Sequence, residues 1–238
     1  MQESTKIEKM SKWNESNYVA RPVINNTPPS FPVEFMVKIF KSPSYLSYFA
    51  ALPAGRKVLD VGCGSGNNLR FFLENGLEGY GVEINESMIG LCTKNLMRLG
   101  LKAQIAQGTN STLPYPDETF DIVTSINTIH YEDDLMGAKR SLSEFRRVLK
   151  PGGRVFIVSA GPRHDIRRET EFLGNKRYIV KNYDFRSGDV FTFFDDQMDL
   201  KRFVENDFTD VEAGTILEEY PKARLEFLFA HGFKMENV

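Results

Sequence analysis

The segment Val58-Leu59-Asp60-Val61-Gly62-Cys63-Gly64-Ser65-Gly66 is the most informative part of this chain. Its apolar first half predicts a buried strand, and the helical spacing of Leu and Phe over residues 67–75 predicts a helix that ends at Gly76. Glycines at three alternate positions allow a tight turn and a close approach of the backbone to a ligand. Because the free N–H groups of the helix face this turn, the stretch predicts a cradle for a nucleotide or an anion.

The spacing of the glycines narrows the choice of nucleotide. The last glycine is followed by Asn67, so the loop is neither the Gly-x-Gly-x-x-Gly of dinucleotide sites nor a phosphate-binding P-loop. Asp60 would repel a pyrophosphate and attract an ammonium group, although it could simply cap the turn. Glu83 ends the next predicted strand and can accept from both hydroxyls of a ribose; the alternative is an ordinary surface acid. These features fit a ligand with an adenosine ribose and an amino-acid end.

Two further motifs follow these in order, Leu113–Asp121 (LPYPDETFD) and Arg147–Gly153 (RVLKPGG). With the glycine loop and Glu83, they resemble the class I S-adenosylmethionine-dependent methyltransferases over residues 55–160. The resemblance implies an α/β fold with a Rossmann-like, doubly wound, mostly parallel seven-stranded sheet, an antiparallel C-terminal strand and helices on both faces. It also implies S-adenosylmethionine as cofactor and S-adenosylhomocysteine as product.

The hydrophobic pattern predicts the elements of this fold. Strands are expected at 57–61, 79–84, 102–106, 120–125, 154–159, 208–217 and 224–231, the last two antiparallel, and helices at 67–75, 86–99, 133–149 and 196–206. Residues 1–52 are expected to form a helical lid or substrate region, with two short helices divided by Pro43. Residues 53–238 are expected to form the cofactor-binding domain, with an irregular insert at 160–195 that lacks clean periodicity.

The resemblance assigns the cofactor contacts. It places Asp60, Gly62 and Gly64 at the methionine portion, Glu83 at the ribose, and Ile84 and Met88 at the adenine. The family's acid after the third strand is replaced here by polar residues, so Thr109 or Asn110 would accept from the adenine amine without charge assistance. The remaining expected contacts are Cys63, Gly66, Ser111, Asn127, Tyr18 and Arg21. Cys63 is not expected to act as a nucleophile.

Methyl transfer needs an in-line arrangement, and a general base only for a hydroxyl or a protonated amine. His130, just after the fourth predicted strand, is the candidate base, and Tyr131 is a candidate for orienting the substrate. The alternative for His130 is packing at the strand end. The acids at 132–134 open a predicted helix, where acids favour the dipole, so no metal is expected.

Residues 163–186 interleave basic and aromatic side chains. Their arginines could grip a carboxylate or phosphate of the substrate, but a solvated helix face balanced by Asp165, Glu169 and Glu171 is the favoured interpretation. The basic residues are Arg163, His164, Arg167, Arg168, Lys176, Arg177, Lys181 and Arg186, and the aromatic residues are Phe172, Tyr178, Tyr183 and Phe185.

The formal net charge of −2, and the lack of an Asn-Pro-Pro motif at 127–130, argue against nucleic-acid methylation. Two cysteines cannot form a disulfide framework, and no apolar run approaches the length of a membrane span, so a cytoplasmic protein is expected. Its expected oligomeric state is a monomer or a homodimer. The predicted function is methyl transfer to an oxygen or nitrogen of a small polar metabolite, such as a sugar or a natural-product intermediate. The alternatives are a protein- or RNA-directed methyltransferase and a catalytically silent S-adenosylmethionine-binding regulator.

Overall fold

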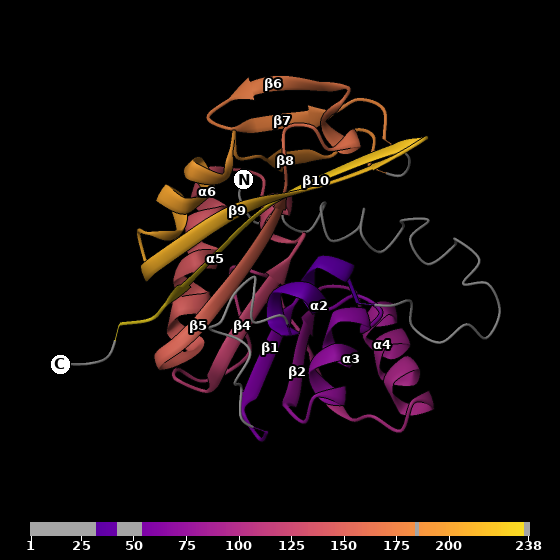
Figure 1. Cartoon of the computed structure of the whole chain (residues 1–238), viewed down its shortest axis with the longest axis vertical. Helices are drawn as coiled ribbons and strands as arrows, with labels where there is room; N and C mark the ends of the chain where they lie inside the picture. Colours follow the sequence, from indigo (N-terminus) through magenta and orange to yellow (C-terminus); the bar gives the residue numbers. More distant parts are fainter. Residues whose placement is uncertain (1–31, 42–53, 184–185, 236–238) are drawn as a thin grey trace. The chain divides into compact units, whose positions relative to one another are not determined.

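The computed structural model describes residues 32–41, 54–183 and 186–235 (Figure 1). Seven strands form one sheet in the order β3-β2-β1-β4-β5-β10-β9, and three further strands form a second sheet, β6-β7-β8. In the large sheet only β10 runs antiparallel to its neighbours, so the predicted mostly parallel sheet with an antiparallel C-terminal strand is confirmed. The chain divides into two compact units at Thr109/Asn110.

Within residues 54–109, the first unit contains three parallel strands and the helices that follow the first two of them. The strands are β1 (Lys57–Val61), β2 (Glu78–Glu83) and β3 (Ala103–Gln107), and the helices are α3 (Asn67–Glu74) and α4 (Glu86–Arg98). Two glycines of β2 make close packing possible. A Cβ atom on Gly79 would lie 2.7 Å from Leu73, and one on Gly81 would lie 2.7 Å from the Cys63 sulfur. Helix α3 and the glycine loop therefore pack directly against the backbone of β2.

Helix α2 (Glu34–Lys41) belongs to the same unit and packs on α3. The ring of Phe40 meets those of Phe71 and Phe72 edge-on, with centroids 6.2 and 5.2 Å apart. The backbone N–H of Val33 donates to the Asn68 side chain at 3.1 Å. This helix is the first of the two predicted between residues 33 and 52, and the second lies outside the described residues.

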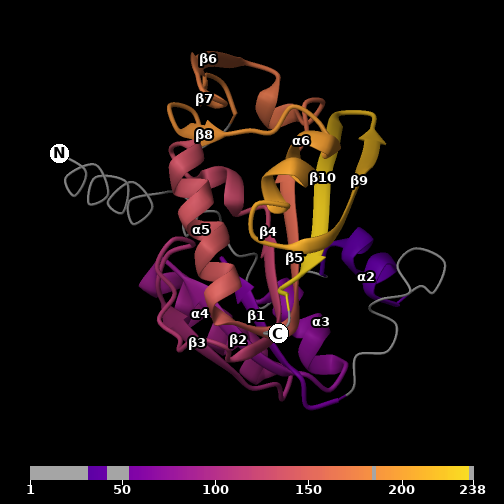
Figure 2. The ribbon, with the colours of Figure 1, turned by 90° about the vertical axis from the view of Figure 1, so that its left-hand side faces the viewer.

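The second unit is built on β4 (Phe120–Ile126), α5 (Leu135–Val148), β5 (Leu149–Ala160), α6 (Gln197–Val204), β9 (Thr209–Tyr220) and β10 (Ala223–Phe233). Figure 2 shows β5, β10 and β9 side by side, as their pairing requires. Strand β5 begins at Leu149, five residues before the predicted start at 154. Because Gly152 adopts a φ of 70° and Gly153 lies against the Lys150 carbonyl, Pro151-Gly152-Gly153 is accommodated within the strand.

Arg147 joins two of the sequence motifs. Its guanidinium donates to the carbonyls of Leu113 and Tyr115 at 3.1 and 2.8 Å, and it forms ion pairs with Asp117 and Glu144 at 2.8 and 2.7 Å. Segment 113–117 is thereby fixed against the last turn of α5. The motifs Leu113–Asp121 and Arg147–Gly153 therefore form one structural element.

The prediction that residues 160–195 are irregular is wrong. They contain β6 (Thr170–Gly174), β7 (Arg177–Val180) and β8 (Val190–Thr192), which form the small antiparallel sheet in Figure 1. The loop between β6 and β7 is Asn175-Lys176, with φ of 49° and 62°, as in a type I′ hairpin turn. Strands of three to five residues are too short to show alternation, and Lys replaces the usual glycine of this turn, so the sequence signal was weak.

Candidate functional site

The glycine loop connects β1 to α3, and its glycines serve different purposes. Gly62, Gly64 and Gly66 have φ of 72°, 52° and 91°, which other residues adopt only at a cost. A Cβ atom on Gly64 would have nothing within 4 Å, whereas one on Gly66 would lie 3.0 Å from the Cys92 sulfur. Gly64 therefore presents open backbone, while Gly66 is required for packing against α4.

Glu83 ends β2 and holds the loop in place. Its carboxylate accepts from the backbone N–H of Gly64 at 3.1 Å and from that of Ile84 at 2.8 Å, and the residue is only 7% exposed. On the β2 side, the carbonyl of Val82 accepts from the N–H groups of Gly62 and Cys63. Glu83 is therefore a structural part of the loop, and the alternative of a surface acid is excluded.

The start of α4 carries the residues expected at the adenine. The side chain of Asn85 caps this helix by accepting from Ser87 N–H at 2.9 Å. Ile84 is half-buried, while Met88 is buried. Ile84 therefore has more surface available to a ligand than Met88, and both contacts remain predictions.

Cys63 lies within the loop but lacks the properties of a reactive thiol. Both Cys63 and Cys92 are buried free thiols that pack in one cluster with Leu69 and Leu96. A hydrogen bond with Cys92, followed by burial, raises the pKa of the Cys63 thiol well above its usual value. Since the thiolate is the nucleophile, Cys63 is not suited to covalent catalysis.

Among the remaining expected cofactor contacts, Thr109 ends the first unit, and Asn110, Ser111 and Asn127 belong to the second unit. Asn127 follows β4 with a φ of 58°, and its buried Oδ1 has no hydrogen-bond partner among the described residues. The amide nitrogen of Asn110 donates to the Thr128 carbonyl and to Glu132, at 3.0 and 3.2 Å. Thr109 and Ser111 are half-buried. Tyr18 and Arg21 lie outside the described residues.

His130 lies in the single turn η1 (Ile129–Tyr131), and its hydrogen bonds do not suit a general base. The residue is 2% exposed, and its Nδ1 accepts from the backbone N–H of Ala160 at 3.3 Å. Burial, together with the positive charge of neighbouring groups, lowers the pKa of His130 well below its usual value. The neutral ring therefore carries its proton on Nε2, so that nitrogen cannot accept one. This geometry matches the packing alternative, and a catalytic role for His130 stays a prediction.

The side chain of Asp134 caps α5 by accepting from Gly137 N–H at 2.7 Å, and that of Glu132 accepts from the Asn110 side chain at 3.2 Å. The main-chain carbonyl of Asp133 accepts from Arg177 at 3.0 Å. In the part of the chain that the structure describes, no three His, Cys, Asp or Glu side chains gather as a metal site would require.

The basic residues of 163–186 fall into two groups. Arg168 and Lys181 form surface ion pairs with Asp165 and Glu171, at 2.6 and 2.5 Å. Arg186, by contrast, is 5% exposed and lies over the Tyr131 ring, and Arg167 lies over the Phe193 ring. The favoured interpretation, a solvated helix face, is therefore wrong for these two arginines, which belong to a compact insert of short strands.

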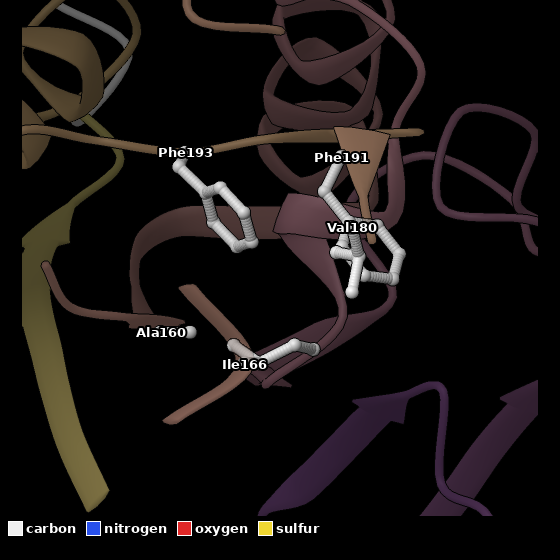
Figure 3. Packing of buried hydrophobic residues seen from close by; sticks show 5 residues of the cluster. All are labelled: Ala160, Ile166, Val180, Phe191 and Phe193. Carbon is white, nitrogen blue, oxygen red and sulfur yellow. The ribbon is translucent and has the colours of Figure 1, made fainter. Parts of the chain in front are cut away.

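The insert packs on the turn that carries His130 and Tyr131. Thr192 donates to the Glu132 carbonyl at 2.8 Å, and the rings of Phe191 and Tyr131 have centroids 5.0 Å apart. Figure 3 shows its apolar centre, in which the side chains of Ala160, Ile166, Val180, Phe191 and Phe193 come together. Sequence reasoning did not single out Phe191 and Phe193, and the only available signal was the dense aromatic spacing of residues 191–194.

The fold and the glycine loop with Glu83 define a methyltransferase domain of the class I, S-adenosylmethionine-dependent type. Residues 59–157 match the family profile described as "Methyltransferase domain", which confirms the resemblance seen in the sequence. The glycine loop and β2 fall within the matched residues, as do β4, η1, α5 and most of β5. The cofactor of this class is S-adenosylmethionine.

Relatives are similar over this domain. They include a sterol 24-C-methyltransferase of Gibberella zeae (37% identity, 48% of this chain and 30% of the relative) and a fatty-acid O-methyltransferase of Mycolicibacterium smegmatis (33%, 47% and 40%). A third is a tRNA (carboxymethyluridine(34)-5-O)-methyltransferase of Arabidopsis thaliana (32%, 60% and 33%). The chain spans less than half the length of each of these relatives.

Solved structures extend the likeness of the fold beyond the matched domain. A SAM-dependent methyltransferase from Methanosarcina mazei superposes with a TM-score of 0.64 over 78% of this chain and 95% of the other, at 20% identity. At this identity the likeness supports the fold alone. Among the described residues, no helix is long and apolar enough to cross a membrane.

Proposed function

We propose that this chain transfers the methyl group of S-adenosylmethionine to an oxygen or nitrogen atom of a small polar metabolite, such as a sugar or a natural-product intermediate. The observation that carries the proposal is the hydrogen bond from the Gly64 backbone N–H to the Glu83 carboxylate. It holds Gly64, where the loop has open space, next to Glu83, a hydrogen-bond acceptor, and both residues lie inside the region that matches the methyltransferase profile.

The residues described above fit this cofactor. Gly62 and Gly64 would bind its amino-acid portion, with Asp60 as an acid for the ammonium group, and Glu83 would accept from the ribose hydroxyls. The unsatisfied Oδ1 of Asn127 is a further acceptor. When bound, S-adenosylmethionine supplies a methyl group already activated on a sulfonium, so the protein is required chiefly to orient the acceptor and exclude water.

Two observations favour a small acceptor. The formal net charge of −2 provides no overall basic footprint for a polyanion. The insert is short, with its own apolar centre, and it packs on the turn of Tyr131, the residue proposed to orient the substrate. The relatives are named for acceptors as different as a sterol, a fatty acid and a tRNA, so the family leaves the acceptor open.

The proposal is tested first by calorimetric titration of the purified protein with S-adenosylmethionine, S-adenosylhomocysteine and NAD. We expect micromolar binding of the two sulfur ligands and none of NAD. The absence of any binding of the sulfur ligands to folded protein would overturn the proposal.

An acceptor screen then follows S-adenosylhomocysteine release with sugars, amino sugars, polyols, amines, fatty acids and phenols, and with total tRNA as the competing class. Turnover with a small molecule supports the proposal. Turnover with tRNA alone would favour the RNA-directed alternative, for which the Arabidopsis relative is the specific observation. Cofactor binding with no turnover on any acceptor would favour the silent regulator.

We also propose a cytoplasmic location, since both cysteines are free buried thiols, as in proteins of a reducing compartment. The expected monomer or homodimer is tested by light scattering of the purified chain.

A further inference from the structure

Strand β6 forms one edge of the small sheet in the insert. Because the strand order of this sheet is β6-β7-β8, β7 is the only strand that pairs with β6 among the described residues (Figure 1). The strand Thr170–Gly174 therefore has one long side that no described strand covers. Such an edge presents backbone N–H and C=O groups that can pair with a further strand.

A hydrogen bond at the end of the β6–β7 pair shows which backbone groups of β6 face outward. The N–H of Lys181 donates to the Glu169 carbonyl at 2.8 Å, so these residues form a hydrogen-bonded pair. In an antiparallel ladder such pairs alternate with pairs whose polar groups point away from each other. The N–H and C=O groups of Thr170 and Phe172 therefore point away from β7. Val180, which lies opposite Thr170, uses its own N–H and carbonyl in hydrogen bonds on the far side of β7, as this alternation requires.

Two apolar side chains on this edge are exposed to solvent. Phe172 is 61% exposed and Leu173 is 41% exposed, and as consecutive residues of a strand they point to opposite faces of the sheet. The Phe172 ring meets the Tyr178 ring of β7, with centroids 5.1 Å apart. Each face of the small sheet thus has an exposed apolar side chain on β6. Apolar side chains on an uncovered edge favour the addition of another strand.

The charges at β6 suit a second copy of the same strand. Its single ionic side chain, Glu171, forms an ion pair with Lys181 of the same chain. Next to the strand, Arg168 and Lys176 are each paired with an acid of the same chain. Two copies of β6 therefore approach each other without bringing unpaired like charges together.

The edge strand β9 of the large sheet differs from β6 in its charge. All four of its ionic side chains are acidic: Asp210, Glu212, Glu218 and Glu219. Like charges that face each other across two strands destabilise the pairing. Of these two edges, β6 is therefore the one suited to pairing with itself.

We propose that two copies of this chain form a dimer by antiparallel pairing of their β6 strands, which joins two three-stranded sheets into one sheet of six strands. A two-fold axis at Phe172 places this residue opposite Phe172 of the partner subunit, so that their outward backbone groups bond and their rings become cross-strand neighbours. On the other face, Leu173 lies opposite Glu171 of the partner subunit, whose carboxylate is held by the ion pair described above. The inference goes beyond methyl transfer and does not depend on it.

The test is sedimentation equilibrium of the full chain over a wide range of protein concentrations. The mass of the wild type should rise from 27.2 kDa toward twice that value. Phe172→Asp and Phe172→Lys should each weaken dimerisation by about a hundredfold, because two buried rings are replaced by two like charges that face each other. An equimolar mixture of the two variants should form the dimer again, since opposite charges then face each other at the two-fold axis.

Met198→Asp is the matched control. Met198 is an apolar residue of α6 that is 47% exposed, and the first turn of a helix favours an acid, so dimerisation should be unchanged within about twofold. Hydrogen exchange provides a second measurement on the wild type. The N–H of Phe172 should exchange more slowly as the protein concentration rises, whereas that of Glu171, which faces β7, should not change.

Three results would overturn the inference: a mass of 27.2 kDa at every concentration, a dimer that neither substitution of Phe172 weakens, or no recovery of the dimer in the mixture. A thermal melt checks that each variant is folded, which we expect because Phe172 is exposed. If a variant does not fold, the wild-type exchange rate of the Phe172 N–H decides, and a rate independent of concentration would refute the pairing of β6.

Discussion

The glycine loop and the insert are formed by different kinds of chemical group. The loop is made of backbone N–H groups, glycines with positive φ and one carboxylate, all within residues 62–83. The insert, with the turn η1 on which it packs, is made of rings and guanidinium groups brought together from residues 130–193. A site made of main chain in a short stretch can be recognised in the sequence. A site made of side chains from distant stretches depends on packing, and it can change while the loop stays the same.

Of the substitutions that test this difference between the loop and the insert, the one expected to have the largest effect lies in the loop. Glu83→Ala should weaken S-adenosylhomocysteine binding by about a hundredfold, because the ribose acceptor and the partner of the Gly64 N–H are lost together. The measurement is isothermal titration calorimetry. Glu86→Ala, which removes an exposed acid at the start of α4, is the control and should bind normally. Equal binding by wild type and Glu83→Ala would refute the assigned ribose contact.

Acid stability should depend in part on His164 of the insert. Burial lowers the pKa of His164 from 6.5 to about 4, so the folded protein prefers the neutral ring. At this residue the unfolded chain therefore binds an extra proton between these values, and the contribution of His164 to stability is complete above pH 6.5 and falls as the pH drops toward 4, by about 3 kcal/mol. Urea unfolding measured from pH 7.5 to 4 checks this.

His164→Asn is the matched variant for that measurement. The His164 Nδ1 accepts from Ile166 N–H at 3.1 Å, and an asparagine oxygen can take its place without titrating. The variant should lose less stability across this range than wild type. A pH dependence identical to that of wild type would show that His164 is not the group responsible.

Within the loop, Gly66→Ala should cost about 2 kcal/mol of unfolding free energy. Both the φ of 91° and the close approach to the Cys92 sulfur oppose a Cβ atom. Gly64→Ala, with a φ of 52° and open space, should cost less. Chemical denaturation of both variants measures the difference, and equal losses would remove the packing role assigned to Gly66.

The smallest expected effect is that of His130→Asn on turnover. An asparagine oxygen can accept from Ala160 N–H as Nδ1 does, so we expect kcat to fall by less than about tenfold with an unchanged pH profile. Loss of a general base usually costs about 100-fold or more. The pH profile on the acceptor found by the screen is the measurement. A loss of that size, together with loss of the basic limb, would restore His130 as the base.

Local sequence patterns were enough to predict the elements around the glycine loop. The apolar run before the glycines, the glycines themselves and Glu83 placed β1, the loop, α3 and β2 within a residue or two of their observed bounds. These features arise because strand burial, helix periodicity and positive φ each leave a mark within a few residues.

The structure of the insert, by contrast, follows from packing between distant parts of the chain. Arg186, Tyr131 and Phe193 lie up to 62 positions apart, and nothing local indicates that the guanidinium groups of Arg186 and Arg167 lie over rings while Arg168 remains on the surface. The hydrogen bond between Ala160 and His130 likewise joins residues 30 positions apart, and it favours the packing alternative for this histidine. Such contacts depend on the packing of the whole unit, because the energy of a buried charge or ring is set by neighbours that the fold supplies.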